Sequence, residues 1–150
     1  EVPKVLTPHI GEFSRLTGLD VEEINSNALS LAIKYAKKWN VVLVLKGAPT
    51  IVALTNGAAY LVNSGSSAMA TGGSGDVLTG VIAGLMAQGL EGDAAAICGA
   101  YLHGLAGSMA TDGMPGLAAG EIIENIFRAW QEVYEKNDEV NHLQLFVNVW

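Results

Sequence analysis

The chain has 150 residues, half of them hydrophobic and 15% charged, so its length suits one domain with a substantial core. No apolar run reaches the ~18 residues of a membrane-spanning helix, and eight scattered lysines and arginines with a net charge of −7 argue against a nucleic-acid partner. The N-terminus lacks the pattern of a signal peptide and Cys98 has no second cysteine, so we expect a cytoplasmic protein with no membrane or nucleic-acid partner.

The first part of the chain predicts strands and helices in alternation. Residues 5–6 predict the end of a short strand, and residues 11–17 predict a short helix that stops before a glycine. A longer helix is expected over 26–39, where apolar residues recur with helical spacing. The run VVLVL at 41–45 is continuous and rich in β-branched residues, which is typical of a strand covered on both faces, as in a parallel sheet.

The second part predicts a hairpin and three closing helices. Asn56-Gly57 lies between the apolar runs of residues 50–62 and indicates a type I′ turn, which needs positive φ at both central residues. Helices are expected over 76–88, 93–111 and 118–134, with Cys98 in the core. Glycines in the middle helix favour close approach of a neighbouring backbone. The last helix has an apolar stripe expected to be core, made of Ile122, Ile123, Ile126, Trp130 and Val133.

This order of elements places the chain in the α/β class, with a mostly parallel sheet of at most about four strands that includes a β-hairpin, followed by helices. Residues 1–134 are expected to form one domain portion. Residues 135–150 form a tail without an assignment. Because the chain opens on what resembles an interior strand, we expect it to be the C-terminal portion of a larger domain.

The stretch MATGGSGDVLTG, residues 69–80, predicts a phosphate site. Gly72, Gly73 and Gly75 can adopt left-handed backbone conformations that turn several N–H groups toward one anion. A helix that starts near Asp76 adds unpaired amides and the positive end of its dipole, and Ser74 can donate one more hydrogen bond. The spacing fits neither the Walker loop nor the dinucleotide fingerprint.

Asp76 is the informative residue of this stretch. A carboxylate beside a phosphate site is electrostatically costly unless it has a task, and accepting a proton from an attacking hydroxyl is such a task. Two other roles stay open from the residues alone: a helix cap and a metal ligand.

The stretch GGSGDVLTGVIAGLMAQG, residues 72–89, resembles the Gly-x-Gly-Asp signature of the ribokinase-like superfamily, and within it the chain is most similar to the NAD(P)H-hydrate dehydratase family. Four further stretches agree, at 6–18, 41–52, 63–76 and 99–107. The resemblance implies part of a three-layer α/β/α fold. It also implies dehydration of the (6S)-hydrates of NADH and NADPH, with ADP or ATP as co-substrate and Mg²⁺ bridging the nucleotide phosphates.

The resemblance also implies a role for each matching position. Asp76 would take the proton of the hydrate's hydroxyl while Gly73, Ser74 and Gly75 hold the transferring phosphoryl group. His9 and Glu12, with Asp76, would contact the hydrate. The implied nucleotide-binding positions are Lys46, Gly47, Ala48, Pro49, Thr50, Ser66, Ser67, Met69, Ala70, Thr71, Gly72, Gly73, Ser74 and Gly75. His103 is expected to be a packed helix residue.

Two rival functions remain open. One is a vitamin or sugar kinase of the same superfamily, of the hydroxymethylpyrimidine or hydroxyethylthiazole type, and the other is a non-catalytic nucleotide-binding half-domain. Because domains of the family are much longer than this chain, we expect it to associate with the missing N-terminal half or with another copy. We also expect weak or no activity from these 150 residues alone.

Overall fold

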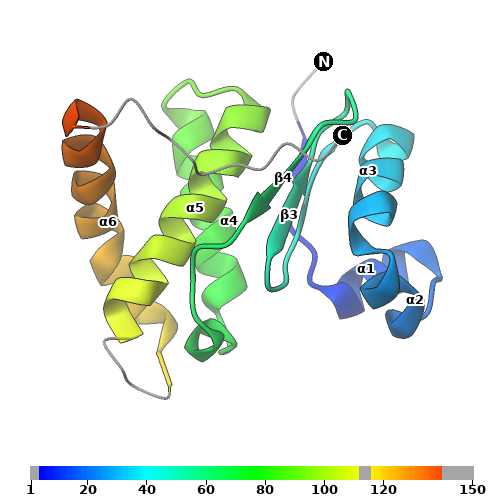
Figure 1. The fold of residues 1–150 in the computed structure, drawn as a ribbon, viewed down its shortest axis with the longest axis horizontal. Helices are drawn as coiled ribbons and strands as arrows, with labels where there is room; N and C mark the ends of the chain where they lie inside the picture. The colour runs from blue at the N-terminus through cyan, green and yellow to red at the C-terminus, as the bar shows by residue number, and fades with distance from the viewer. Residues whose placement is uncertain (1–3, 112–115, 140–150) are drawn as a thin grey trace.

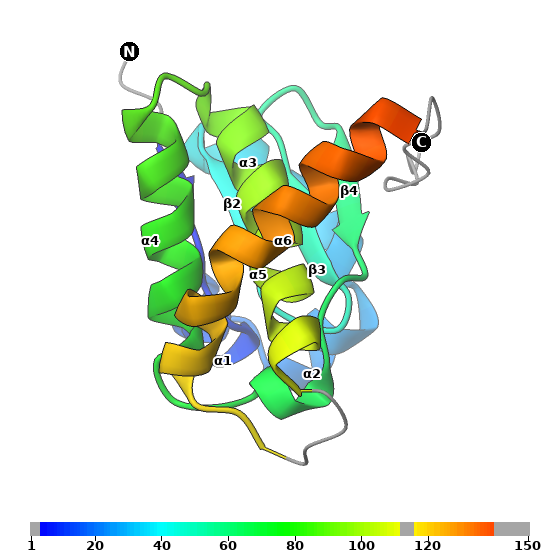
Figure 2. The ribbon, with the colours of Figure 1, turned by 90° about the vertical axis from the view of Figure 1, so that its left-hand side faces the viewer.

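A computed structural model describes residues 4–111 and 116–139, which form a four-stranded sheet between layers of helices (Figure 1). Helices α1, α2 and α3 cover one face of the sheet, α4 and α5 cover the other, and α6 packs on the outer side of α5 (Figures 1 and 2). The elements are, in chain order, β1 (Val5–Leu6), α1 (Ile10–Thr17), α2 (Val21–Ser26), α3 (Ala28–Trp39), β2 (Val42–Leu45), β3 (Thr50–Ala53), β4 (Ala59–Val62), the 3-10 helix η1 (Ser67–Met69), α4 (Ser74–Ala87), α5 (Gly92–Thr111) and α6 (Ala119–Glu139).

The sheet has the order β1-β2-β3-β4. β1 pairs with β2 in parallel, with Val5 opposite Val42, whereas β2–β3 and β3–β4 are antiparallel. The α/β class is therefore confirmed. Within the described residues, however, the parallel character expected for most of the sheet is limited to the β1–β2 pair, because the chain turns back directly after β2 and adds the hairpin strands beside it.

β2 is covered on both faces, as its sequence predicts. Val42 and Val44 belong to the core that the sheet forms with α4, α5 and α6, whereas Leu43 and Leu45 belong to the core on the side of α1, α2 and α3. Since successive side chains of a strand point to opposite faces, this one run of residues serves two cores.

The predicted hairpin is present, but its turn differs from the expected type. Only Gly57 has a positive φ, of 97°, and Asn56 does not. The Asn56 side chain instead accepts a hydrogen bond from the Ala58 N–H at 2.9 Å, and the Leu54 N–H donates to the Ala58 carbonyl at 2.8 Å. The wider loop relieves Asn56 of the left-handed conformation that a type I′ turn would impose.

The helices are close to their predicted positions, with three differences. α2 was not expected, and it takes the residues before α3, which therefore starts at Ala28. α4 starts at Ser74, two residues before the expected start. α6 continues to Glu139, and the part of the expected tail from 140 to 150 lies outside the described residues. No helix within 4–111 or 116–139 has the length and apolarity needed to cross a membrane.

Two expectations about the core are wrong. Cys98 is exposed and not in the core. The expectation failed because α5 is apolar around most of its circumference, so its composition alone does not indicate which face is buried. On α6, Ile122 is buried, but Ile123 is 59% exposed and Trp130 is 47% exposed. The stripe of α6 that packs on the core is rotated relative to the expected one and runs through the buried Ile122 and Ala129 and the partly buried Ile126 and Val133.

Candidate active site

The predicted site residues from distant parts of the chain meet at the carboxyl ends of β1 and β2. The Lys46 N–H donates to the Pro8 carbonyl at 2.9 Å, and an isolated parallel bridge pairs His9 with Lys46. The hydroxyl groups of Thr7 and Thr79 lie 3.0 Å apart and join this edge to α4. The amino ends of α1 and α4 lie at the same edge, at the lower side of Figure 2. In open α/β sheets this edge is where ligands bind.

The glycine loop has the geometry of an anion site. Gly73 is the N-cap of α4 and has a φ of 88°, a left-handed conformation that side chains disfavour. Among the described residues, the N–H groups of Gly72, Gly73 and Gly75 donate to no backbone carbonyl, whereas the Asp76 N–H donates to the Gly73 carbonyl at 3.0 Å. Three free amides therefore lie at the positive end of the α4 dipole, as expected.

Lys46 brings a positive charge to this loop. A methyl group placed on Gly75 would lie only 2.7 Å from the Lys46 Nζ, so the ammonium group covers that glycine. The same Nζ lies 3.5 Å from the Glu12 carboxylate, whose pKa is lowered chiefly by the hydrogen bond from the His9 N–H and further by the Lys46 charge. The ammonium, the free amides and the helix dipole all favour negative charge at this place.

His9 and Glu12 form a capping box at the start of α1. The His9 N–H donates to the Glu12 carboxylate at 2.7 Å, and the Glu12 N–H donates to His9 Nδ1 at 3.1 Å. The two residues implied as hydrate contacts are thus held together at the same edge as Lys46, and His9 remains exposed.

Asp76 lies in the first turn of α4 with an exposed side chain. The cap of the helix is Gly73, and no side chain caps it, so the role of a helix cap for Asp76 is not supported. Within the described part of the chain, no group of three or more His, Cys, Asp or Glu side chains could hold a metal ion. The Asp76 carboxylate makes no hydrogen bond or ion pair to any described residue, which leaves it free to meet a ligand.

The remaining predicted nucleotide contacts have mixed surroundings. Ser74 is 7% exposed and its hydroxyl faces α5, so in this structure its hydroxyl does not face the solvent side of the loop. Met69 packs against Gly107 of α5, and the Ser66 hydroxyl accepts from the Ala68 N–H at 3.1 Å, inside the loop. Of the turn after Lys46, Thr50 is half-buried and donates to the Gly47 carbonyl at 3.2 Å. Gly47, Ala48, Pro49, Ser67 and Ala70 are exposed, Thr71 is half-buried, and the Ala48–Pro49 peptide bond is cis.

Comparison with protein families identifies the chain. The family of NAD(P)H-hydrate dehydratases matches residues 1–128, which is most of the sequence. The chain belongs to the NAD(P)H-hydrate dehydratase family. The resemblance noted in the glycine loop and in the segments around it is thereby confirmed.

The chain is similar to several members of the NAD(P)H-hydrate dehydratase family. A bifunctional NAD(P)H-hydrate repair enzyme of Moorella thermoacetica is 49% identical over 124 residues, which cover 81% of this chain and 23% of the relative. The ADP-dependent (S)-NAD(P)H-hydrate dehydratase of Bacillus subtilis is 37% identical over 133 residues, covering 87% and 48%. The Bacillus subtilis ADP/ATP-dependent enzyme, crystallized with ATP/Mg²⁺, matches with a TM-score of 0.83 and 36% identity, covering 87% of this chain and 48% of that one. The chain thus spans less than half the length of these relatives.

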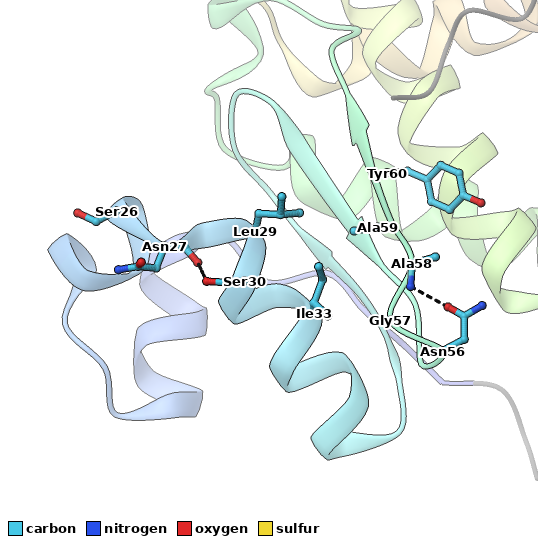
Figure 3. A pocket seen from close by; sticks show the side chains of 10 residues that line it. All are labelled: Ser26, Asn27, Leu29, Ser30, Ile33, Asn56, Gly57, Ala58, Ala59 and Tyr60. Carbon is cyan, nitrogen blue, oxygen red and sulfur yellow. Dashed lines mark hydrogen bonds between the residues drawn. The ribbon is translucent and has the colours of Figure 1, made fainter. Parts of the chain in front are cut away.

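In this chain a separate groove lies between α3 and the β3–β4 hairpin (Figure 3). Leu29 and Ile33 of α3 face Ala59 of β4 across it, and Tyr60 lies farther along the strand. None of the predicted site residues is among the side chains that line it. The groove is therefore not part of the active-site candidate.

Sequence reasoning missed three residues that build the site. Thr7 and Thr79 are 72 positions apart, and no sequence pattern indicates that their hydroxyls meet. His103 was expected only to pack inside a helix, which is confirmed, but its ring also contacts Ser74 of the glycine loop. The one signal that could have indicated this contact is the presence of His103 within a stretch that matches the family.

Proposed function

We propose that this chain carries the catalytic part of a nucleotide-dependent NAD(P)H-hydrate dehydratase, which uses ADP or ATP to restore NADH or NADPH from their (6S)-hydrates. The observation that carries the proposal is that the exposed Asp76 carboxylate, which has no partner among the described residues, belongs to the same helix start as the free amides of Gly73 and Gly75, with the Lys46 ammonium over Gly75. The relatives that are named for this reaction support the choice of substrate.

The proposed chemistry follows from the difficulty of expelling hydroxide. Asp76 accepts the proton of the C6 hydroxyl as that oxygen attacks the terminal phosphoryl group of the nucleotide, and ADP leaves from ATP, or AMP from ADP. The amides of Gly73 and Gly75 and the Lys46 ammonium stabilise the charge that develops on the phosphoryl oxygens. The lone pair of the ring nitrogen then expels phosphate, C5 loses a proton, and the reduced nicotinamide ring is restored.

The surroundings of the loop fit a magnesium nucleotide better than a metal held by the protein alone. Mg²⁺ usually binds through one or two carboxylates together with substrate phosphates, where it neutralises phosphate charge. Glu12 is already paired with Lys46 and contacts His9, and Asp76 has the role of the base, so the nucleotide phosphates are the ligands left for such an ion. We propose Mg²⁺ as a companion of the nucleotide on this basis.

The test compares two matched substitutions in the native full-length protein. Asp76→Asn removes the proposed base, and Asp93→Asn removes an exposed acid from the first turn of α5, so both change the charge at a helix start equally. We expect Asp76→Asn to lower hydrate turnover by at least about 10²-fold because a general base contributes on that scale, with nucleotide affinity retained. Asp93→Asn should leave turnover unchanged.

The assay follows the absorbance of reduced nicotinamide with racemic hydrate and each nucleotide, and nucleotide binding is measured by calorimetry. Consumption of only half of the hydrate supports the (6S) assignment. Turnover of Asp76→Asn equal to that of the wild type refutes the role of Asp76. A stable phosphorylated alcohol without regained absorbance would indicate the kinase function instead.

We also propose that residues outside this chain complete the cleft, either a preceding segment or a second copy. β1 has only two residues, lies at an edge of the sheet and exposes Leu6, which supports a further strand beside it. The single, unpaired cysteine supports a reducing compartment, and we propose the cytoplasm.

A further inference from the structure

His103 is a buried titratable residue that the proposed reaction does not use. It lies in the middle of α5, 9% exposed, and its imidazole points at the first residue of α4. His103 Nε2 lies 2.9 Å from the Ser74 carbonyl oxygen and 3.3 Å from the Ser74 hydroxyl oxygen. The contact joins α5 to the glycine loop, since His103 and Ser74 are 29 residues apart in the sequence.

The contact fixes the hydrogen on the ring. A carbonyl oxygen only accepts hydrogen bonds, so Nε2 must carry the hydrogen and donate it to Ser74. Burial lowers the pKa of His103, the hydrogen bond to the Ser74 carbonyl opposes this, and the nearby Lys46 charge lowers it further. The ring is therefore neutral near neutral pH, and its one N–H is committed to the loop.

The contact is made where the site is assembled. Ser74 lies between Gly73 and Gly75, whose amides are free, and it is two residues before Asp76. Glycines lose more conformational freedom on folding than other residues, so a loop rich in them needs an external contact to hold one geometry. α5 also packs against residues that lead into the loop, since Gly104 lies against Ser64 and Gly107 lies against Met69.

We propose that His103 is a positioning residue for the phosphoryl transfer: its imidazole holds Ser74 so that the Gly73 and Gly75 amides and the Asp76 carboxylate keep one fixed arrangement. The proposal rests on the proposed function. His103 does not touch the reacting atoms, because Ser74 lies between the ring and the loop surface. Its effect on rate arises through geometry, and displacement of a catalytic group by about 1 Å can cost on the order of 10²-fold in rate.

The test uses two substitutions of similar size. His103→Met removes the donor while keeping an apolar side chain in the space, and His103→Gln places an amide N–H₂ donor near the position of Nε2. Ile122→Val, at a buried position of α6, serves as a control that lowers the unfolding temperature without removing the hydrogen bond between His103 and Ser74. Turnover is corrected for the folded fraction of each variant.

We expect His103→Met to lower kcat by about 10- to 100-fold while the nucleotide KM changes by less than about 3-fold, and His103→Gln to recover most of the loss. Ile122→Val should keep the wild-type kcat. A loss of thermal stability without a change in kcat in His103→Met overturns the proposal, and so does a His103→Gln variant as slow as His103→Met.

A second measurement needs no substrate. The amides of Asp76 and Val77 both donate to the Gly73 carbonyl, and we expect their hydrogen exchange to accelerate in His103→Met relative to amides of α6, and not in His103→Gln. Unchanged exchange in His103→Met overturns the proposed contact whatever the activity. A wild-type protein that turns over no hydrate instead refutes the proposed function.

Discussion

Gly73 provides a sharp test of the loop geometry. Its φ of 88° is left-handed, and a methyl group added to it would lie 3.1 Å from the Cβ of Ala119. Gly84 offers a matched control in the same helix, because a methyl group there meets nothing within 4 Å and its φ is not left-handed. We therefore compare Gly73→Ala with Gly84→Ala.

The expected difference in stability follows from the backbone at each position. Gly73→Ala should destabilise the fold by about 1–2 kcal/mol, because Cβ disfavours the left-handed region, and the close approach to Ala119 adds to this cost. Gly84→Ala should stabilise by about 0.5–1 kcal/mol, since alanine is the better residue in a helix interior. The two substitutions should thus differ by roughly 1.5–3 kcal/mol or more.

Urea unfolding followed by circular dichroism measures both free energies of unfolding, and nucleotide titration measures the effect on the loop. We expect Gly73→Ala to weaken nucleotide binding and Gly84→Ala to leave it unchanged. If Gly73→Ala is as stable as Gly84→Ala and binds nucleotide normally, the left-handed conformation of residue 73 and its part in the anion site are wrong.

Two further predictions concern the site edge and the sheet edge. Because the pKa of Glu12 lies below its ordinary value of 4.5, its contribution to stability is present above that value and is lost as the pH falls through the lowered pKa. Wild type and Glu12→Gln should differ in unfolding temperature at about pH 6 and converge toward about pH 3, and a constant difference would contradict this. Sedimentation velocity of the 150-residue chain should show species larger than the monomer, since no described strand lies beside the outer edge of β1, and a strict monomer at all concentrations would contradict it.

Local patterns in the sequence predict much of this fold. The run at 41–45 indicates a strand covered on both faces, and the Asn56-Gly57 pair indicates a hairpin, because both signals depend on neighbouring residues. The predicted type I′ turn was wrong because the loop is wider than a two-residue turn, and only Gly57 has a positive φ in it. α2 escaped prediction since it has only six residues and gives little periodicity.

Contacts between distant residues set the limit of such prediction. The composition of the loop indicates an anion site, but the position of Lys46 over Gly75 depends on the register of β1 and β2. Likewise, the exposure of Cys98 and Trp130 depends on how α5 and α6 are rotated against their neighbours, which the apolar content of a helix does not specify.

The cap at the start of α1 restricts what His9 can recognise. Since its Nδ1 accepts the Glu12 N–H, a neutral ring carries its hydrogen on Nε2, which lies 3.6 Å from the Glu12 carboxylate and is exposed to an incoming molecule. His9 therefore offers a donor and no acceptor to an incoming molecule. A carbonyl, hydroxyl or phosphate oxygen finds a partner there, and a group that can only donate does not.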